Sequence, residues 1–247
     1  MFSFLNNIPQ VTKNILILNV LFFLASLVFE KQGVDLATLF GSHFFNSAFF
    51  EPFQVITSMF FHATFIHLFF NMFIFVMIGS SLEKLWGAKR FFIFVMAVGL
   101  GAVVFHNIFG VIELSNIKKQ LVNLGYNIDS LDNQLKSIGG IRYNSKDQWI
   151  IDKYLMRSGT SGFGASGIVY GLLIAFGILF PNTEFYMYFL FPIKAKYLIS
   201  FYFIFEVIQI FSHSATDFVG HVAHVGGAIT AAIMVIYWRK TDKKNFW

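Results

Sequence analysis

The chain contains no cysteine and little charge: only 13% of its 247 residues are Asp, Glu, Lys or Arg. The absence of cysteine excludes structural disulfides, thiolate metal sites and a cysteine nucleophile. The scarcity of charge accompanies 56% hydrophobic residues and 35 phenylalanines. A soluble domain of this length could not bury so much apolar surface, so lipid must be the solvent for much of the chain.

Six apolar stretches approach the length of about 20 residues that a helix needs to cross a hydrocarbon core of about 30 Å. They lie at residues 14–29, 63–82, 91–112, 164–180, 197–213 and 222–238. Lipid accepts only helices and closed barrels, and these runs are too long and unbroken for barrel strands. The sequence therefore predicts an all-α membrane protein with six transmembrane helices, in a single polytopic domain over residues 1–247.

Basic residues gather beside the predicted spans and contribute to a net charge of +5. They are Lys84, Lys89, Arg90, Lys194, Lys196, Arg239, Lys240, Lys243 and Lys244. The positive-inside rule assigns these segments, and with them both termini, to the cytoplasm. This distribution indicates contact with the bilayer and gives no reason to expect a nucleic-acid partner.

Two segments are expected on the outer side of the membrane. Residues 31–62 are too apolar for a solvated loop, so they are predicted to form an amphipathic first outer loop in the interface. Residues 113–162 form a long helical insertion between the third and fourth spans. The insertion divides the core into residues 14–112 and 160–238.

A heptad stripe in the insertion predicts an amphipathic helix, or a pair of helices, over residues 117–138. The stripe consists of Ile117, Leu121, Leu124, Ile128, Leu131, Leu135 and Ile138. Gly125 and Asn127 are candidate positions for a break. Two accounts stay open: the stripe packs on the surface of the protein or the membrane, or it makes a coiled-coil contact with a partner.

Polar residues cluster at three places in the predicted spans, and intramembrane polar groups are costly enough to indicate function. The clusters read HATFIHLFFN at 62–71, GASGIVYG at 164–171 and GHVAHVGGA at 220–228. In the predicted topology all of them lie near the outer ends of their helices. His67 and Asn71 are four residues apart and share a helix face, as do Ser166 and Tyr170.

Small residues recur at a spacing of four on two of these helices, as Gly167 and Gly171, and as Gly227 and Ala231. Small faces let helices approach closely, which would bring the Ser166 hydroxyl within hydrogen-bond reach of His224. Each signal alone is weak. Serines in membrane helices usually bond to their own backbone, and a single membrane histidine is more often an interhelical donor than a catalyst.

Together, the clusters in this order on the second, fourth and sixth spans resemble the rhomboid family of intramembrane serine proteases. The resemblance covers roughly residues 59–112 and 160–238. It implies a rhomboid-like bundle that hydrolyses peptide bonds in or near transmembrane segments of membrane proteins. A histidine suits this chemistry, because a serine hydroxyl is a poor nucleophile until a base takes its proton near neutral pH.

The resemblance also implies roles for single residues. Ser166 would be the nucleophile and His224 the general base of a catalytic dyad. His67 and Asn71 would stabilise the oxyanion together with the Ser166 backbone N–H. The implied supporting residues are Tyr170, Gly164, His62, His221 and Gly227.

The carboxylates and the first outer loop fall outside this pattern. The family works as a dyad, so Glu206 in the fifth span either faces a water-filled cavity beside the site or accepts a hydrogen bond from a neighbouring helix. Glu83, at the end of the second span, is expected to brace the fold. Many family members carry Trp-Arg ahead of that span, where this chain has Phe53 and Gln54, so the resemblance does not predict how the loop is anchored.

Two other functions stay open. The four histidines His62, His67, His221 and His224 are candidate ligands of zinc or haem. A catalytically inactive rhomboid-like protein could bind membrane proteins as a chaperone, although such a protein is expected to lack the serine or the histidine. The leading hypothesis is the peptidase, with transmembrane protein substrates, the lipid bilayer as partner, no metal or cofactor, and a place in the bacterial inner membrane.

Overall fold

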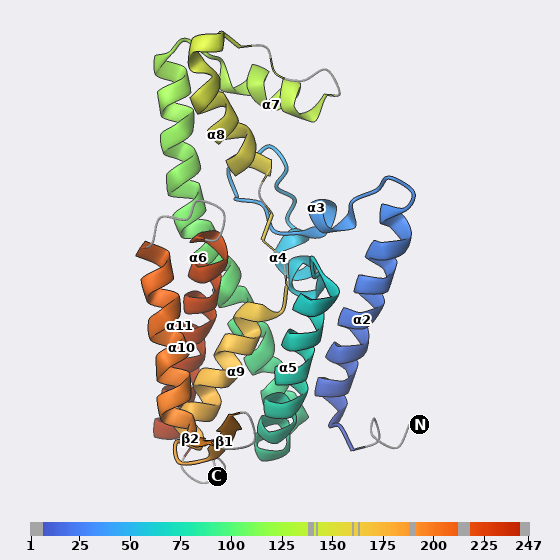
Figure 1. Ribbon diagram of the computed structural model, residues 1–247, viewed down its shortest axis with the longest axis vertical. Helices are drawn as coiled ribbons and strands as arrows, with labels where there is room; N and C mark the ends of the chain where they lie inside the picture. Colours follow the sequence, from blue (N-terminus) through green and yellow to red (C-terminus); the bar gives the residue numbers. More distant parts are fainter. Residues whose placement is uncertain are drawn as a thin grey trace.

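The computed structural model describes residues 7–137, 141, 143–159, 161–162, 164–187, 191–211 and 218–242. Long helices stand side by side in a bundle, and a smaller helical unit projects from one end of it (Figure 1). In chain order the elements are α2 Gln10–Glu30, α3 Leu36–Phe40, α4 Gln54–Thr57, η1 Ser58–Phe60, α5 Phe65–Trp86, α6 Ala88–Asn123, α7 Ile128–Lys136, η2 Ser145–Asp147, α8 Gln148–Gly159, α9 Ser166–Leu179, β1 Glu184–Met187, β2 Phe191–Lys194, α10 Ala195–Phe211 and α11 Phe218–Thr241.

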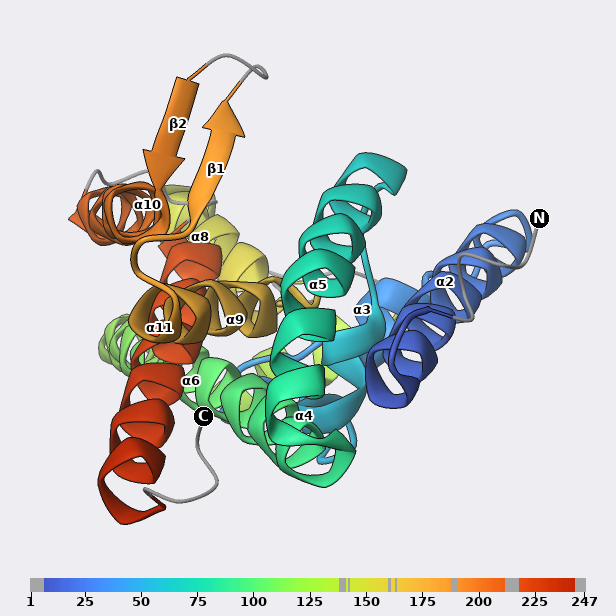
Figure 2. The ribbon, with the colours of Figure 1, turned by 90° about the horizontal axis from the view of Figure 1, so that it is seen from below.

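Four of the described helices are long and apolar enough to cross a membrane: α2, α5, α6 and the part of α11 from Gly220 to Thr241. Helices α9 and α10 are shorter, with 14 and 17 residues, and stand in the same bundle (Figures 1 and 2). The prediction of an all-α membrane bundle is confirmed, and four of the six predicted spans meet the length criterion. The last residues of the predicted fifth span, 212–213, lie outside the described residues.

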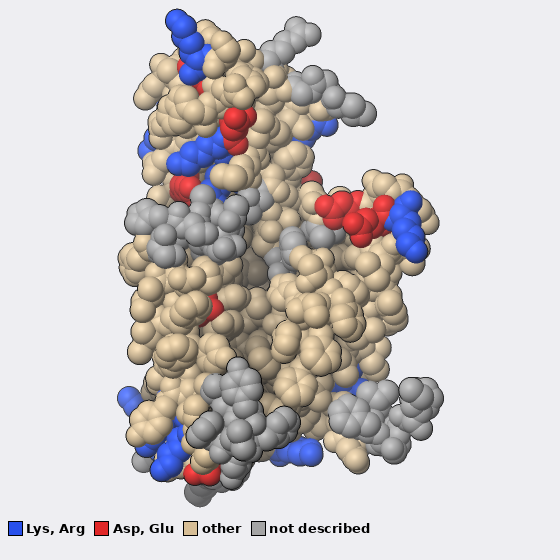
Figure 3. Space-filling view, in the orientation of Figure 1, with Lys and Arg blue, Asp and Glu red and all other residues tan. Residues whose placement is uncertain are grey.

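The surface of the bundle is apolar, as expected of a protein that lies in lipid. Large side chains point outward, among them Phe65, Phe201 and Ile233, each more than 60% exposed. On the face shown in Figure 3, charged side chains gather toward the two ends and the middle is largely uncharged. An apolar surface of this extent indicates contact with membrane rather than water.

The first and last bundle helices have their free ends at the same end of the molecule: α2 begins there and α11 ends there (Figure 1). At this end the Glu83 carboxylate accepts hydrogen bonds from the backbone N–H groups of Val11 and Thr12, at 2.8 and 2.7 Å. It also accepts a bond from the Thr12 hydroxyl at 2.7 Å. Glu83 therefore braces the start of α2 against α5, as the sequence predicts.

Helices α9 and α11 touch through glycines. A Cβ atom added to Gly227 would lie 2.1 Å from the Gly167 carbonyl oxygen, and one added to Gly171 would lie 3.3 Å from Cβ of Ala231. Only residues without a larger side chain permit such a contact between helix backbones. The spacing of small residues in the sequence thus predicted the correct pair of helices.

Helix α9 is too short to cross the hydrocarbon core alone. Its 14 residues make about 21 Å of helix, against about 30 Å for the core. It ends near β1 and β2 at one end of the bundle and begins partway along it, below the upper ends of α2 and α5 (Figure 1). The first residue of α9, Ser166, therefore lies within the depth of the bundle.

The first outer segment, residues 31–62, is anchored by a buried glutamine. Gln54 is 2% exposed. Its Nε2 donates hydrogen bonds to the carbonyl oxygens of Leu39 and Phe49, at 3.1 and 3.0 Å. Its Oε1 accepts a bond from the Glu51 backbone N–H at 3.1 Å. One side chain thus holds several turns of this segment in place, at the position for which the resemblance made no prediction.

The third predicted span and the start of the insertion form one continuous helix. Helix α6 has 36 residues, about 54 Å of helix. No glycine or proline lies between Gly110 and Gly125, so the helix continues past residue 112. The chain then turns at Gly125, whose φ of +90° is left-handed and favours glycine. Asn127 caps the next helix by accepting a hydrogen bond from the Ser130 backbone N–H. The predicted break is confirmed, whereas the expected boundary near residue 112 is not a helix end.

The heptad stripe packs inside a small outer unit, which we define as α6 from Glu113 onward together with α7 and α8. Its core consists of Leu114, Ile117, Leu121, Leu131, Ile150, Ile151 and Tyr154, together with Phe44 from the first outer segment. Leu124 is exposed, and Ile138 lies outside the described residues. The buried part of the stripe is covered by the chain itself, and a partner contact through residues 117–138 stays a prediction.

Polar contacts close the outer unit. The Arg157 guanidinium pairs with Glu113 at 3.0 Å, and the Tyr154 hydroxyl donates to the Asp132 carboxylate. Burial and the neighbouring carboxylate raise the pKa of Tyr154, so its hydroxyl stays protonated and remains a donor.

A short antiparallel hairpin of β1 and β2 connects α9 to α10 and projects from the bundle (Figure 2). The sequence predicts an all-α protein with spans at residues 164–180 and 197–213, and no strand between them. The strands are EFYM and FPIK, and their aromatic and β-branched residues favour extended structure. Runs of this length carry too little periodicity to be recognised beside long apolar helices.

Candidate active site

The Ser166 hydroxyl and the His224 ring meet between α9 and α11. The distance from Ser166 Oγ to His224 Nε2 is 2.9 Å. One turn along α9, the Tyr170 ring stacks on His224 with the centroids 4.3 Å apart and an interplanar angle of 15°. The close contact between Gly167 and Gly227 allows the two helices to bring these side chains together.

Ser166 is the first residue of α9, and no side chain in the described part of the chain caps this helix end. The first N–H groups of a helix have no acceptor within the helix, and the helix dipole is positive there. The start of α9 is therefore suited to stabilising negative charge beside the Ser166 hydroxyl.

The loop that leads into α9 is held by hydrogen bonds and by a glycine. Gly164 has a φ of +117°, and its N–H donates to the Ser58 carbonyl at 2.8 Å. The next N–H, of Ala165, donates to His62 Nε2 at 3.4 Å. A Cβ on Gly164 would lie 3.1 Å from Cε1 of His67, so both the backbone conformation and the space favour glycine.

A groove of about 400 Å³ lies on the α5 and α10 side of the pair. It is lined by His67 and Asn71 of α5 together with Ser166 and His224. The Asn71 side-chain nitrogen is buried and has no hydrogen-bond partner within the described residues, which leaves its N–H groups available to a ligand. The remaining lining is mostly apolar, from Phe70, Ile74, Leu173, Leu198, Ile199 and others.

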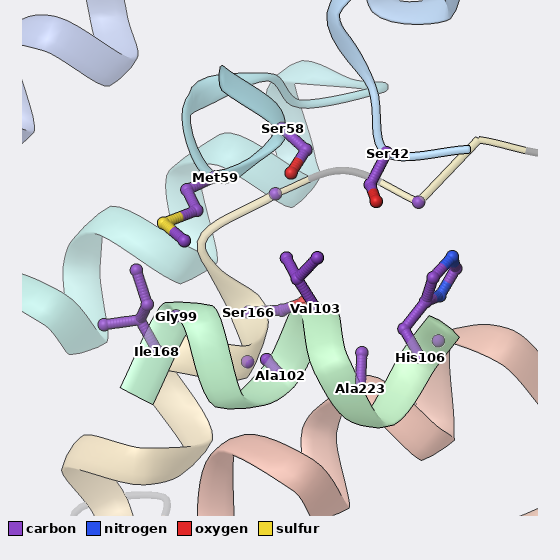
Figure 4. A pocket seen from close by; sticks show the side chains of 14 residues that line it. Ser42, Ser58, Met59, Gly99, Ala102, Val103, His106, Ser166, Ile168 and Ala223 are labelled. Carbon is purple, nitrogen blue, oxygen red and sulfur yellow. The ribbon is translucent and has the colours of Figure 1, made fainter. Parts of the chain in front are cut away.

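A second cavity, of about 80 Å³, lies between Ser166 and α6. In Figure 4, Ser42 and Ser58 of the first outer segment lie on one side of it, and Val103 and His106 of α6 lie on the other. Backbone hydrogen bonds between Ser42 and Gly162, at 2.8 and 2.9 Å, tie the first outer segment to the loop before α9. The cavity is large enough for water molecules and has polar groups to bind them.

Glu206 of α10 is the residue whose place the motifs did not predict. It is 3% exposed and lies on the far side of the His224 ring from Ser166. Its Oε2 lies 2.9 Å from His224 Nδ1 and 2.6 Å from His221 Nδ1, and Tyr170 donates its hydroxyl proton to Oε1. The sequence left two interpretations of Glu206 open, a water-filled cavity or hydrogen bonding to a neighbouring helix, and hydrogen bonding is the one observed. The sequence feature that could have indicated this place is the carboxylate within a predicted span, because an ionisable group there is costly.

One group of described residues has the composition of a metal site: Glu206, His221 and His224. It differs from the set of four histidines suggested by the sequence, and His62 and His67 instead pack edge to face with ring centroids 5.1 Å apart. Zinc ligands at about 2.0–2.1 Å in a tetrahedron lie about 3.3 Å from one another. The N···O distances of 2.6 and 2.9 Å here are those of direct hydrogen bonds.

The long apolar helices of the bundle indicate an integral membrane protein. Its serine–histidine pair lies at the start of a short helix within that bundle. The family model described as the rhomboid domain matches the sequence at residues 50–114 and 143–241, well over half of the chain. The chain therefore belongs to the rhomboid family. The matched segments omit residues 115–142, which include the end of α6 and all of α7.

One similar protein is an uncharacterized mitochondrial rhomboid protein of Schizosaccharomyces pombe. It is 31% identical over 101 residues, which correspond to 36% of this chain and 26% of the relative. The chain thus aligns with about a quarter of the length of that relative. Family membership and an integral membrane location follow from these comparisons, and the activity requires a separate argument.

Proposed function

We propose that the protein is an intramembrane serine endopeptidase with a Ser166–His224 catalytic dyad. The observation that carries this proposal is the distance of 2.9 Å between Ser166 Oγ and His224 Nε2, at the start of a helix within the bundle. Rhomboid-family membership is consistent with it.

In the proposed reaction, Ser166 Oγ attacks the carbonyl carbon of the scissile bond while its proton passes to His224 Nε2. His67, Asn71 and the N–H groups at the start of α9 donate to the resulting oxyanion, where one such donor is typically worth about 10²–10³ in rate. His224 then donates the proton to the leaving amine, and water hydrolyses the acyl-enzyme. Tyr170 holds the ring of the base. Gly164, Gly227, His62 and His221 shape the loop and helices around it.

The substrate class follows from the groove. It joins the dyad to an apolar wall contributed by α5, α9 and α10, which suits the side chains of a transmembrane segment. The cavity beside Ser166 suits the water that deacylation consumes. We therefore propose transmembrane proteins as substrates, cleaved in or near the membrane, with no cofactor required.

The proposal is tested with a fluorophosphonate probe and a transmembrane model substrate in liposomes. Wild type should be labelled and should cleave, whereas Ser166→Ala and His224→Ala should do neither. Ser81→Ala is the matched control, because Ser81 is a membrane-helix serine that bonds to its own backbone, at the Met77 carbonyl. A folded wild type that neither labels nor cleaves would refute the proposal and favour the inactive membrane-protein binder.

We further propose that both termini are cytoplasmic. The support is the set of basic helix ends that gather where α2 begins and α11 ends, including Lys84, Arg90 and Arg239. Because the chain has no cysteine, single cysteines report sidedness directly. Lys31→Cys should react with an impermeant maleimide in intact cells, and Lys89→Cys only after permeabilisation; the reverse would invert the topology. The bacterial inner membrane stays a prediction.

A further inference from the structure

A buried carboxylate stands behind the proposed general base, at the nitrogen that does not face the serine. His224 Nε2 bonds to Ser166 Oγ and His224 Nδ1 bonds to Glu206 Oε2, each at 2.9 Å. We propose that Glu206 is a positioning residue that orients His224 and stabilises its charged form. The proposed Ser166–His224 dyad would then be extended by Glu206, which acts through His224. This inference rests on the proposed peptidase function.

The hydrogen bonds dictate the tautomer that the reaction needs. To accept the Ser166 proton, His224 Nε2 must be unprotonated, so the neutral ring carries its proton on Nδ1. That proton points to an oxygen of Glu206, which as a carboxylate can only accept. Glu206 therefore selects the active tautomer and prevents the ring from turning over.

The same contact stabilises the charge that develops during the reaction. The Ser166 proton moves to His224 Nε2 as the bond from Oγ to the carbonyl carbon forms, and the ring becomes an imidazolium. Glu206 keeps its negative charge and accepts the Nδ1–H bond throughout. The proton leaves Nε2 with the amine product, so no net proton passes to Glu206.

The surroundings of Glu206 hold it in place for this task. Tyr170 donates to Oε1. His221 Nδ1 lies 2.6 Å from Oε2, the same oxygen that His224 contacts. Tyr170 thus contacts the base with its ring and fixes the carboxylate with its hydroxyl. An ionisable side chain in a membrane helix is costly. A donor or acceptor without charge would satisfy helix packing alone, so a carboxylate at this point indicates a role in charge stabilisation.

The test compares two identical substitutions of buried carboxylates. Glu206→Gln keeps the size of the side chain but presents an amide that lacks charge and has its own N–H groups. Glu83→Gln makes the same change at a residue that is 4% exposed and bonds only to the start of α2 among the contacts described above. For both, kcat and KM are measured separately on the transmembrane substrate, and the folded fraction is measured by thermal unfolding in detergent.

We expect Glu206→Gln to lower kcat by about 10²–10⁴-fold, because the wrong tautomer is favoured, with little change in KM. Glu206→Asp, which restores the charge, should recover much of the lost rate. Glu83→Gln should lower the melting temperature without changing the kcat of the folded enzyme. A purely structural role for Glu206 would instead predict a lower melting temperature, an unchanged kcat of the folded fraction and no specific rescue by Asp.

Several outcomes would overturn the inference. One is a kcat for Glu206→Gln equal to that of wild type while Ser166→Ala is inactive, which would leave the peptidase standing as a dyad. Another is an equivalent of metal in purified wild type that is lost in Glu206→Gln, with chelation lowering kcat as much as the substitution does. A wild type without activity would refute the proposed function and with it the role of Glu206.

Discussion

The membrane bundle and the outer unit are held together by different physical effects. In the bundle, α9 and α11 approach until the backbones of Gly167 and Gly227 touch, and large apolar side chains face outward. In the outer unit, Leu121 and Tyr154 are fully buried in a compact apolar core. Lipid does not drive apolar side chains inward, so close packing and hydrogen bonds must hold the bundle, whereas water drives the collapse of the outer unit.

Because different effects hold the bundle and the outer unit together, the two regions should be destabilised by different kinds of substitution. The contact between α9 and α11 sets the distance between the Ser166 and His224 side chains. A substitution that pushes these helices apart would lengthen that distance. The outer unit is joined to the site through α6, through the loop between α8 and α9, and through the first outer segment. Phe44 of that segment enters the outer core, and Ser42 bonds to Gly162 of the loop. The bundle should therefore be sensitive to added volume, and the outer unit to lost volume.

The largest effect is expected from added volume in the bundle. Gly227→Ala would place a Cβ 2.1 Å from the Gly167 carbonyl oxygen, and overpacking of this kind costs about 3 kcal/mol. Separation of the helices by about 1 Å should also lower cleavage by about 10²-fold. Gly220→Ala on the same helix, where a Cβ meets nothing within 4 Å, is the matched control for thermal unfolding. Equal stability of the two variants would contradict the glycine contact.

The next effect is expected from lost volume in the outer unit. Leu121→Ala empties a fully buried position and should destabilise the outer unit by about 2–3 kcal/mol. Hydrogen exchange of α7 and α8 should rise, while Ser166 probe labelling should change much less than in Gly227→Ala. Leu124→Ala removes an exposed residue of the same stripe and should have little effect. Equal loss of labelling in Leu121→Ala and Gly227→Ala would show that the two regions unfold together.

A smaller effect is expected at Gln54, which anchors the first outer segment. Gln54→Ala leaves the Leu39 and Phe49 carbonyl oxygens without their donor, at a cost of about 1–2 kcal/mol. Limited proteolysis of the first outer segment should become faster, whereas proteolysis of the α7–α8 region should not. Unchanged proteolysis would mean that the remaining contacts of the segment are sufficient to hold it.

The smallest effect is expected from a polar contact in the outer unit. Tyr154→Phe keeps the buried ring and removes the hydroxyl that donates to Asp132, so it should cost about 1 kcal/mol. Local hydrogen exchange in α8 should report this loss, with cleavage by the bundle unaffected. A loss as large as that of Leu121→Ala would mean that polar contacts, and not apolar burial, dominate in the outer unit.

Much of the architecture was predictable because it depends on local sequence. Long apolar runs predicted the bundle helices, the spacing of Gly167, Gly171 and Gly227 predicted which helices touch, and Gly125 predicted the break after α6. The hairpin between α9 and α10 was missed because its strands are short. The boundary at residue 112 was misplaced because apolarity ends there while the helical stripe continues past it.

The sequence by itself determined that lipid is the solvent, that helices cross it, and that Ser166 and His224 are the candidate catalytic pair. Only the tertiary structure decided that Gln54 anchors the first outer segment and that Glu206 stands behind His224. The reason is physical. Apolar runs and small-residue spacing are properties of one helix, whereas the contact of Glu206 with His224 depends on the rotation and height of α10 against α11, which packing of the whole bundle sets.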